Sequence, residues 1–463
     1  MATIGTAEDA GAAPRWREFL VYFVHRHFAF RYAELDAVLT LQGLRLADVV
    51  GCDPSALPDP ARSPVLRVKL PSVAHAAFLS ARGILIKGVY QVWAHAAGSD
   101  GYAALAQRAG AFDDADKTRI LQDAQCAWCI DVDAFGRKLT MEEQEARRTH
   151  FDTALPFPGP VSVRTPDEKF LILEEYDLDV LNPRAATPRQ LFFLRELAGS
   201  ARNRGRGGAR DLVDQQTLKK RAYIGPTAME SEMALLMSNM ALVQPGDVVL
   251  DPFVGTGSVL VPCATHGALC FGTDIDIRVL LGIGVGVSGA GAAPGSSETV
   301  NVQSNFRQYG LPAPELLRAD NSVSPLLDKC AGFFDAILDR KAKKEQQYIP
   351  PTQLYAAEDV MQDLLTVAAR TLRVGGRLVY LLPTTYEYTD ADLPRHSQLR
   401  VIHNCEQKLT KKYARRLITM VKLETPETAD EPNETDAGDR SYANLREKIL
   451  AENRKRKAVE LAE

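Results

Sequence analysis

The sequence predicts an α/β protein in which a C-terminal doubly wound domain follows a smaller α+β domain. At 463 residues the chain is too long for one ordinary core, so two or more domains are expected. In the C-terminal half, apolar runs at 248–250 and 268–271 are typical of buried parallel strands, and a glycine-rich turn follows the first run. Before residue 160, short strand-like and helix-like segments alternate, which favours an α+β module.

The N-terminal module is expected over residues 15–160. Its predicted elements, in chain order, are a strand at 18–23, a helix at 31–39, a strand at 65–70 and a helix at 73–79. The proline-rich segment 155–160 cannot continue regular structure, so it is expected to end the module.

A linker is expected over residues 161–221, and it contains a basic loop. From Arg195 to Arg221 there are eight Arg or Lys residues against three Asp or Glu. Such a loop can follow a phosphate backbone, and a solvated loop without a ligand explains its composition equally well. The candidate nucleic-acid contacts are Arg202, Arg204, Arg206 and Arg210.

The second domain is expected over residues 222–422. The predicted order is a helix at 229–242, strands at 248–250, 268–271, 317–320 and 333–338, a helix at 356–372, a Gly375-Gly376 turn and a strand at 377–382. A low-complexity insertion at 282–297 is interpreted as a mobile loop without chemistry. Residues 423–463 are expected to form an acidic, disordered segment followed by a charged terminal helix.

The glycine-rich turn predicts a ligand site. Asp251-Pro-Phe253-Val-Gly255-Thr256-Gly257 follows the buried run, and its glycines let the backbone turn tightly beneath a ligand. Asp274 ends the next predicted strand, where a doubly wound domain holds a ribose. A dinucleotide site would need a third glycine, but that position is Leu260. The pattern therefore favours S-adenosylmethionine over NAD as the cofactor.

Taken together, these pieces resemble a class I methyltransferase. The resemblance implies that the glycine loop passes under the methionine and ribose part of the cofactor. Asp251 would pair with its ammonium group, Asp274 would hold the ribose hydroxyls, and Asp320 would approach the adenine amine. The candidate cofactor-binding residues are Asp251, Phe253, Gly255, Thr256, Gly257, Asp274 and Asp320.

Composition and charge restrict the remaining classes. A hydrophobic fraction of 46% and a charged fraction of 25% are typical of a globular protein, and the net charge of −4 makes any nucleic-acid surface local. Seven scattered cysteines favour a reducing, cytoplasmic setting. No metal site is predicted, because the lone Cys126-Ala-Trp-Cys129 has no second ligand pair. Neither a signal peptide nor a membrane span is expected.

Further segments carry a more specific resemblance. They are Tyr223-Ile-Gly-Pro-Thr-Ala-Met229, Gly272-Thr-Asp-Ile-Asp276, Asn305-Phe-Arg-Gln-Tyr-Gly-Leu311, Asn404-Cys-Glu-Gln-Lys-Leu409 and Arg415-Arg-Leu-Ile-Thr-Met420, with weaker matches at Phe28-Ala-Phe-Arg31 and Leu155-Pro-Phe157. With the glycine loop they cover most of the chain. They are similar to the catalytic subunit of the tRNA methyltransferase family that makes N2-methylguanosine at position ten.

The resemblance implies an N-terminal THUMP-type RNA-binding domain and a C-terminal Rossmann-like class I methyltransferase domain. It implies tRNA as substrate, S-adenosyl-L-methionine as methyl donor and a small zinc-binding activator subunit as partner in a heterodimer. It also implies that the Gly225-Pro226-Thr227 turn closes over the carboxylate end of the cofactor, which adds Thr227 to the candidate site.

One departure from the family pattern concerns the target amine. Such enzymes end the fourth strand with Asp or Asn, then two prolines and an aromatic residue, which activate the amine and stack on the base. Here Asp339 is the catalytic candidate, but Arg340-Lys-Ala-Lys-Lys344 follows it. The chain is expected to bind its cofactor yet methylate guanine poorly or not at all. A catalytically impaired tRNA-binding protein and a truncated isoform lacking the loop stay open beside the enzyme; a DNA amino-methylase is disfavoured.

Overall fold

The computed structural model describes residues 16–178, 187–199, 208–226, 228–283, 287–288, 300–322, 325–339, 357–410 and 413–426. The chain divides into two compact units, one comprising residues 1–31 and 39–211 and the other residues 32–38 and 212–463. Within the described ranges, no helix is both long and apolar enough to cross a membrane.

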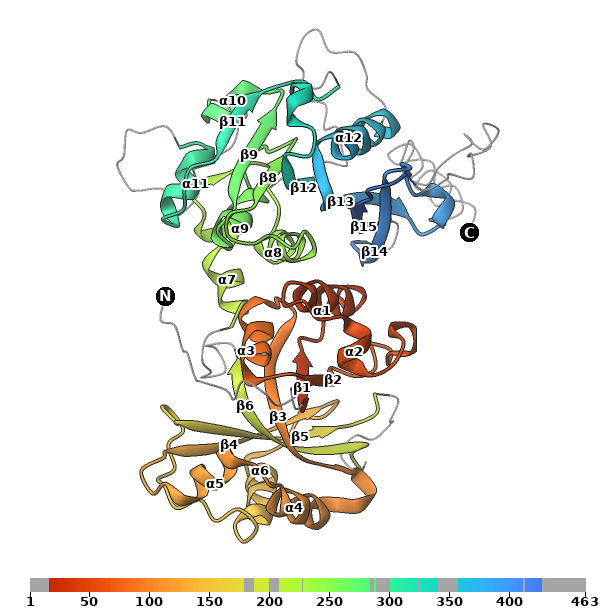
Figure 1. The fold of residues 1–463 in the computed structure, drawn as a ribbon. Coiled ribbons are helices and arrows are strands. Elements are labelled where there is room, and N and C mark those ends of the chain that lie inside the picture. Colours follow the sequence, from red (N-terminus) through yellow and green to blue (C-terminus); the bar gives the residue numbers. More distant parts are fainter. Residues whose placement is uncertain are drawn as a thin grey trace, which may run out of the picture. The chain divides into compact units, whose positions relative to one another are not determined.

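A six-stranded sheet organises the first unit (Figure 1). Its strands are β1 (Arg17–Phe23), β2 (Val65–Leu70), β3 (Ile86–Ala97), β4 (Trp128–Phe135), β5 (Glu168–Glu175) and β6 (Gln190–Gly199), in the order β2-β1-β3-β6-β5-β4. Neighbouring strands are antiparallel except β4 and β5, which are parallel. Helices in this part of the chain are α1 (Arg31–Thr40), α2 (Leu46–Val50), α3 (Val73–Arg82), α4 (Gly101–Ala111), α5 (Ala115–Gln122) and α6 (Met141–Arg148). The predicted α+β class and its first four elements are confirmed.

This sheet extends beyond the boundary that the prolines predicted. β5 and β6 belong to it, although both fall within residues 161–221, the expected linker. The proline-rich segment does interrupt regular structure, but its carbonyl groups still accept hydrogen bonds: Pro160 accepts from the amide of Trp128, at the start of β4, at 3.0 Å. The chain continues from there into β5, whose residues are all buried, so the first unit contains two strands that the limit at residue 160 leaves out.

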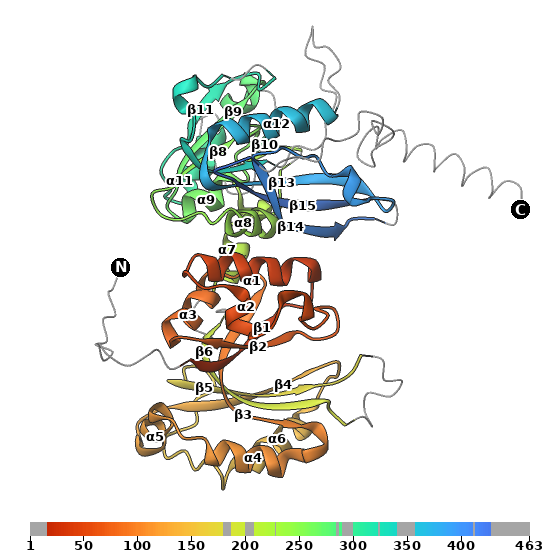
Figure 2. The ribbon, with the colours of Figure 1, turned by 45° about the vertical axis from the view of Figure 1, so that its right-hand side comes forward.

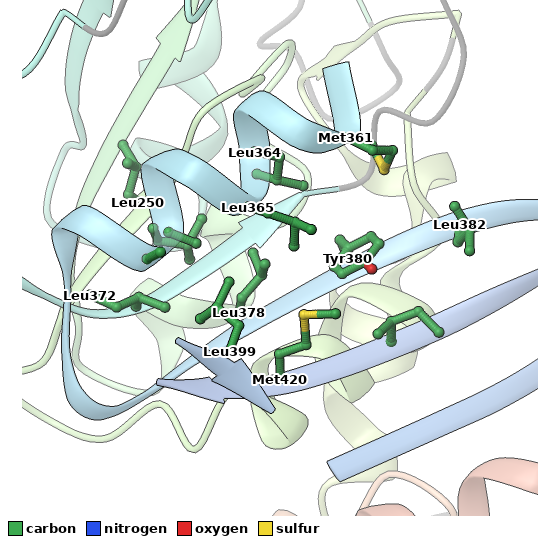
Figure 3. Packing of buried hydrophobic residues seen from close by; sticks show 14 of the residues in the cluster. Leu250, Met361, Leu364, Leu365, Leu372, Leu378, Tyr380, Leu382, Leu399 and Met420 are labelled. Carbon is green, nitrogen blue, oxygen red and sulfur yellow. The ribbon is translucent and has the colours of Figure 1, made fainter. Parts of the chain in front are cut away.

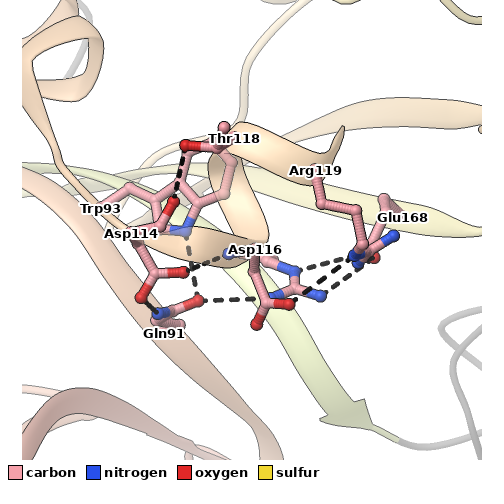
Figure 4. Close-up of polar contacts among 8 residues, drawn as sticks. Gln91, Trp93, Asp114, Asp116, Thr118, Arg119 and Glu168 are labelled. Carbon is pink, nitrogen blue, oxygen red and sulfur yellow. Dashed lines mark hydrogen bonds and ion pairs between the residues drawn. The ribbon is translucent and has the colours of Figure 1, made fainter. Parts of the chain in front are cut away.

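A buried ion-pair network joins β5, β6 and α5 (Figure 4). Arg195 of β6 donates to both carboxylate oxygens of Glu168, at 2.8 and 2.9 Å, and to Asp116 at 2.8 Å. Arg119 adds a second guanidinium to Glu168 at 2.9 Å. A buried arginine needs such partners, because an unpaired charge is costly in the interior. Arg195, the first residue of the predicted basic stretch, therefore lies inside the sheet. Its charge is paired with Glu168 and Asp116.

The second unit contains a seven-stranded sheet in the order β11-β9-β8-β12-β13-β15-β14. Its strands are β8 (Val248–Asp251), β9 (Leu269–Asp274), β11 (Glu315–Arg318), β12 (Phe334–Asp339), β13 (Leu372–Thr385), β14 (Leu399–Lys408) and β15 (Tyr413–Lys422). The first five in sheet order are parallel, whereas β15 is antiparallel to both of its neighbours. A separate two-stranded ribbon pairs β7 (Tyr223–Ile224) with β10 (Val287–Ser288).

Helices cover both faces of the seven-stranded sheet, which confirms the doubly wound prediction (Figure 2). On one face lies α12 (Ala357–Thr371), and on the other lie α8 (Ser231–Met240) and α9 (Leu260–Thr265). The unit also contains α10 (Ile277–Leu281) and α11 (Val302–Gln308), and α7 (Arg210–Gln215) leads into it. Beneath α12, Leu364 and Leu365 pack with Tyr380 of β13 and Met420 of β15 in one hydrophobic cluster (Figure 3).

Two local predictions differ from the structure. The Gly375-Gly376 pair was expected to separate helix and strand, but β13 begins at Leu372 and runs through it. Gly375 has φ 78, and the pairing of β13 with β12 shifts register there, so the glycines make an irregularity within the strand. In the expected loop 282–297, residues 287–288 form β10. Most of that loop, and residues 427–463, lie outside the described ranges.

Candidate active site in the second unit

Acidic residues end three neighbouring parallel strands. Asp251 is the last residue of β8, Asp274 of β9 and Asp339 of β12, and all three are buried. Asp320 lies two residues after β11 and is exposed. Since β11, β9, β8 and β12 are adjacent and parallel, their carboxyl ends lie at one edge of the sheet, where open α/β sheets bind ligands. The structure thus brings the four predicted acids to the same edge.

The loop after β8 makes its turn with two glycines in the left-handed region. Gly255 has φ 51 and Gly257 has φ 77, values at which a side chain would strain the backbone. The amide of Val254 donates to the carbonyl of Thr273 at 2.8 Å, which holds this loop against β9. The amide of Gly255 adds a second link by donating to the carboxylate of Asp274 at 3.0 Å.

The carboxylate of Asp274 retains acceptor capacity for a ligand. Its Oδ2 accepts from Gly255, and its Oδ1 accepts from the amide of Asp276 at 3.0 Å. An ionised carboxylate offers about four acceptor positions, so each oxygen can accept once more. A buried acid with this capacity, next to a glycine turn, fits a ligand that offers vicinal hydroxyl groups, as the ribose of S-adenosylmethionine does. On β8, Asp251 Oδ1 accepts from the amide of Phe253 at 3.0 Å.

Asn305 of α11 joins two segments of the site, although no motif assigned it a role. Its side chain is fully buried. Its Oδ1 accepts from the amide of Tyr223 at 2.8 Å, and its Nδ2 donates to the carbonyls of Tyr223 at 2.9 Å and Thr256 at 3.1 Å. Its place in a family-like segment was the one available signal, because contacts 82 and 49 residues away leave no local pattern.

Glycines also allow two neighbours to press against the loop. A Cβ atom at Gly225 would lie 2.8 Å from Cγ2 of Thr256. One at Gly257 would lie 2.9 Å from Cγ1 of Val302, at the start of α11. Both distances are shorter than ordinary carbon–carbon contacts. The Gly225 turn and α11 therefore both pack directly on the glycine loop, while Thr227 lies outside the described residues.

After β11, Asn321 rather than Asp320 contacts the loop. The Oδ1 atom of Asp320 accepts from the amide and the hydroxyl of Ser322, at 3.0 and 2.8 Å. The Nδ2 atom of Asn321 donates to the hydroxyl of Thr273 at 3.0 Å and also to the carbonyl of Pro252. Asn321 is thus a second residue of the site that the motifs did not indicate.

Burial and the acids at this edge raise the pKa of nearby groups. Burial, with the charges of Asp276 and Asp274, raises the pKa of Tyr223 to about 12. Burial, with the charge of Asp251, raises the pKa of the Cys270 thiol to about 12. Cys270 is therefore a protonated core residue and not a nucleophile. Tyr223 likewise keeps its proton at neutral pH and donates it to the carbonyl of Val279 at 2.9 Å.

Of the four arginines predicted to contact RNA, Arg210 lies in the described ranges, whereas Arg202, Arg204 and Arg206 lie outside them. Arg210 begins α7 and donates to the carbonyl of Ile84 at 2.7 Å. This contact anchors the chain just before α7 to the segment after α3, so the Arg210 guanidinium has a structural use.

Comparison with protein families gives matches in both halves of the chain. Residues 17–202 match the family described as "Tmrp11 THUMP N-terminal domain". Residues 219–278 match the family described as "RMKL-like, methyltransferase domain", and this range contains the glycine loop and Asp274. The first match runs through residue 202, so it includes β5 and β6, as the sheet of the first unit does.

Curated relatives that bear the name tRNA (guanine(10)-N(2))-methyltransferase TRMT11 include proteins from Homo sapiens and Dictyostelium discoideum. The one from Homo sapiens is 31% identical over 439 residues, covering 89% of this chain and 90% of the relative. The one from Dictyostelium discoideum is 31% identical over 449 residues, covering 88% and 82%. Among solved structures, TrmN from Thermus thermophilus is similar with a TM-score of 0.42 and 17% identity, covering 88% of this chain and 100% of that one. The similarity to both relatives therefore spans the two units.

Proposed function

This chain belongs to the tRNA (guanine(10)-N(2))-methyltransferase TRMT11 family, and on that premise we propose that it methylates the 2-amino group of a guanosine in tRNA, with S-adenosylmethionine as methyl donor. The product is N2-methylguanosine at position ten. The observation that best supports a cofactor site is the hydrogen bond from the Gly255 amide to Asp274, because it joins the glycine turn to an acid suited to ribose hydroxyls.

The proposed cofactor site is formed by β8, β9 and the loop that follows β8. The glycine turn would lie beneath the methionine and ribose, with Asp274 accepting from the ribose hydroxyls and Asp251 facing the ammonium group. Asp320 would approach the adenine amine from the end of β11. When bound, S-adenosylmethionine supplies a methyl group that its sulfonium centre makes electrophilic. The further candidates in this site are Phe253, Thr256 and Thr227.

Asp339 is the proposed group at the target amine. It ends β12, the strand next to β8, and its side chain is fully buried. A guanine 2-amino nitrogen is a poor nucleophile because its lone pair is delocalised into the ring. A carboxylate that accepts one of its hydrogens favours the pyramidal form, in which the lone pair is available. Asp339 would also take the proton that the amine loses on methylation.

The segment after Asp339 lowers the turnover that we expect. Arg340-Lys-Ala-Lys-Lys344 stands where the family pattern has two prolines and an aromatic residue. A proline carbonyl that accepts the second amine hydrogen and a ring that stacks on the base are both absent from this sequence segment. We therefore expect catalysis slower than that of a relative with the complete motif.

For the substrate, we assign tRNA binding to the THUMP-type part of the chain, residues 17–202. Among the basic residues that follow β6, Arg202, Arg204 and Arg206 support contact with a phosphate backbone, whereas Arg195 and Arg210 have partners within the first unit. A cytoplasmic location is also proposed, and the seven free cysteines support it.

We further propose a small zinc-binding activator subunit that adds a strand at β11. Among the described strands of the sheet, β11 has one neighbour, β9, and its other edge is open. Leu317 of β11 is 49% exposed and Leu269 of β9 is 55% exposed. By the register of the two strands they face the same side. A strand paired with this edge would satisfy its backbone groups and place its own side chains beside Leu317.

The test uses the full chain co-purified with its activator, tritiated S-adenosylmethionine and unmodified tRNA. One transcript carries guanosine at position ten and a matched transcript carries adenosine there. We expect label in the first transcript alone, and N2-methylguanosine after nuclease digestion and mass spectrometry. Equal label in both transcripts, or cofactor binding without any label transfer, would contradict the proposed reaction.

A further inference from the structure

We infer that Asn305 is a positioning residue that sets the affinity for S-adenosylmethionine by holding the segment 222–226 over the glycine loop. The inference rests on the proposed function, since it takes the glycine loop as the cofactor site. Asn305 itself is assigned no contact with the cofactor. It acts through the two backbone segments that it joins, at Tyr223 and Thr256.

The side-chain amide of Asn305 joins Tyr223 to Thr256, and we call this arrangement the clamp. The amide group supplies the one acceptor and the two donors that the clamp needs. Its oxygen accepts from one N–H group, and the two hydrogens of Nδ2 are directed to two carbonyls, those of Tyr223 and Thr256. Because the side chain is fully buried, water cannot replace these bonds at low cost. No other side chain of similar size offers one acceptor and two donors.

The helix that carries Asn305 is braced on both sides. Gln308, nearly one turn further along α11, accepts from the amide of Ala222 at 2.8 Å and donates to the carbonyl of Lys220 at 2.5 Å. Val302, at the start of α11, packs against Gly257. One face of α11 therefore touches the glycine loop while its polar side chains hold the 220–223 segment.

The chain is fixed to the same loop again at residue 229, after the held segment. The amide of Met229 donates to the hydroxyl of Ser258 at 3.3 Å, and the Gly225 backbone lies against Thr256. Residues 223 and 229 are thus both attached near the glycine loop, and Gly225 lies against Thr256 between them. Releasing the Asn305 end would let the turn move away, and the cofactor would have to order it on binding.

The experiment compares three variants of the full chain by calorimetric titration with S-adenosylmethionine. In N305A all three bonds are lost, and we expect at least a tenfold weaker Kd. In N305D the acceptor remains, but two carbonyls face a carboxylate, so affinity should fall at least as far at about pH 8. As pH falls to about 6, the buried introduced carboxyl group should become protonated and donate, so the N305D affinity should recover in part while N305A does not.

The matched control is N301A, which removes the Asn301 cap at the start of α11 and leaves the clamp intact. It should lower the thermal stability of the chain while the Kd for S-adenosylmethionine stays within about twofold of wild type. Turnover at saturating cofactor and tRNA binding should change little in the Asn305 variants, so the loss appears in KM for the cofactor.

Folded N305A and N305D variants that bind the cofactor within twofold of wild type would overturn the inference. If both variants fail to fold, Q308A provides the decision, because Gln308 is exposed and holds the same segment. An unchanged Kd for S-adenosylmethionine in Q308A would then contradict the inference that α11 sets cofactor affinity by holding this segment. A wild-type chain that does not bind S-adenosylmethionine at all would instead refute the proposed function, which is a distinguishable result.

Discussion

The backbone amide of Gly255 lies 3.0 Å from the carboxylate of Asp274, to which it donates a hydrogen bond. Through this bond one acid orders the turn beneath the proposed cofactor and is placed to accept from its ribose. Changes at Asp274 should therefore affect the shape of the loop and the affinity of the site together.

The first prediction concerns D274N, which keeps the size of the side chain. Both carboxylate oxygens accept from N–H groups, those of Gly255 and Asp276, so in either orientation the new amide NH2 would face an N–H donor. We expect a loss of roughly 1–3 kcal/mol in S-adenosylmethionine binding by calorimetry. D328N is the control, because the Asp328 side chain is fully exposed and belongs to no part of the proposed site. Equal losses in both variants would argue against a special role for Asp274.

The second prediction separates backbone strain from packing at Gly257. The variant G257A would carry a side chain at φ 77 and would place its Cβ 2.9 Å from Val302. G310A is the control, since Gly310 has φ 64 and open space around the Cβ position. We expect the strain common to both to cost roughly 1–2 kcal/mol. In urea unfolding, G257A should lose a further 1–3 kcal/mol, roughly, through overpacking. Similar losses in both would mean that α11 yields to the added methyl group.

The third prediction addresses the segment after Asp339. Inserting an Asp-Pro-Pro-Tyr loop from an intact relative between Leu338 and Lys341 should raise turnover on tRNA, because one positioned group of this kind is worth roughly 10²–10³ in rate. Cofactor affinity should not change, since the glycine loop is on another strand. As a control, the same loop with its acid replaced by Ala should give little gain. An unaltered chain that already matches the relative in single-turnover rate would refute this account.

The fourth prediction concerns the basic stretch. Replacing Arg202, Arg204 and Arg206 by Ala should weaken tRNA binding and reduce the dependence of log Kd on log salt by about 0.7–0.9 for each lost phosphate contact. R210A should instead lower thermal stability, because Arg210 bonds to Ile84. An unchanged salt slope in the triple variant would identify the stretch as a solvated loop.

The fifth prediction tests the open edge at β11. L317D should abolish co-purification with the activator subunit, because a charge would lie beside the side chains of the added strand. L327D is the matched control, since Leu327 is 72% exposed and lies outside the strands. The wild-type chain expressed alone should be poorly soluble and improve on co-expression. Retention of the activator by L317D would place its docking surface elsewhere.

Local sequence patterns determined most of the elements and the place of the site. A buried run such as Val248–Asp251 is stable only in the middle of a sheet that is covered on both faces. The glycines of the turn that follows allow the left-handed backbone of that turn. The acids Asp251, Asp274 and Asp339 were predictable because each follows such a run directly.

The tertiary structure determined which residues form hydrogen bonds and ion pairs across long separations in the sequence. The local sequence around Pro160 predicts the end of the N-terminal module. In the structure, the Pro160 carbonyl accepts a hydrogen bond from the amide of Trp128 and the sheet continues through β5 and β6. Composition places Arg195 in a basic stretch, but its guanidinium forms ion pairs with Glu168 and Asp116 inside the unit. Asn305 has no pattern of its own, because its role comes from meeting Tyr223 and Thr256 in space. Periodicity and turn chemistry act over a few residues and are written in the sequence, whereas hydrogen bonds between distant segments exist only once the chain has folded.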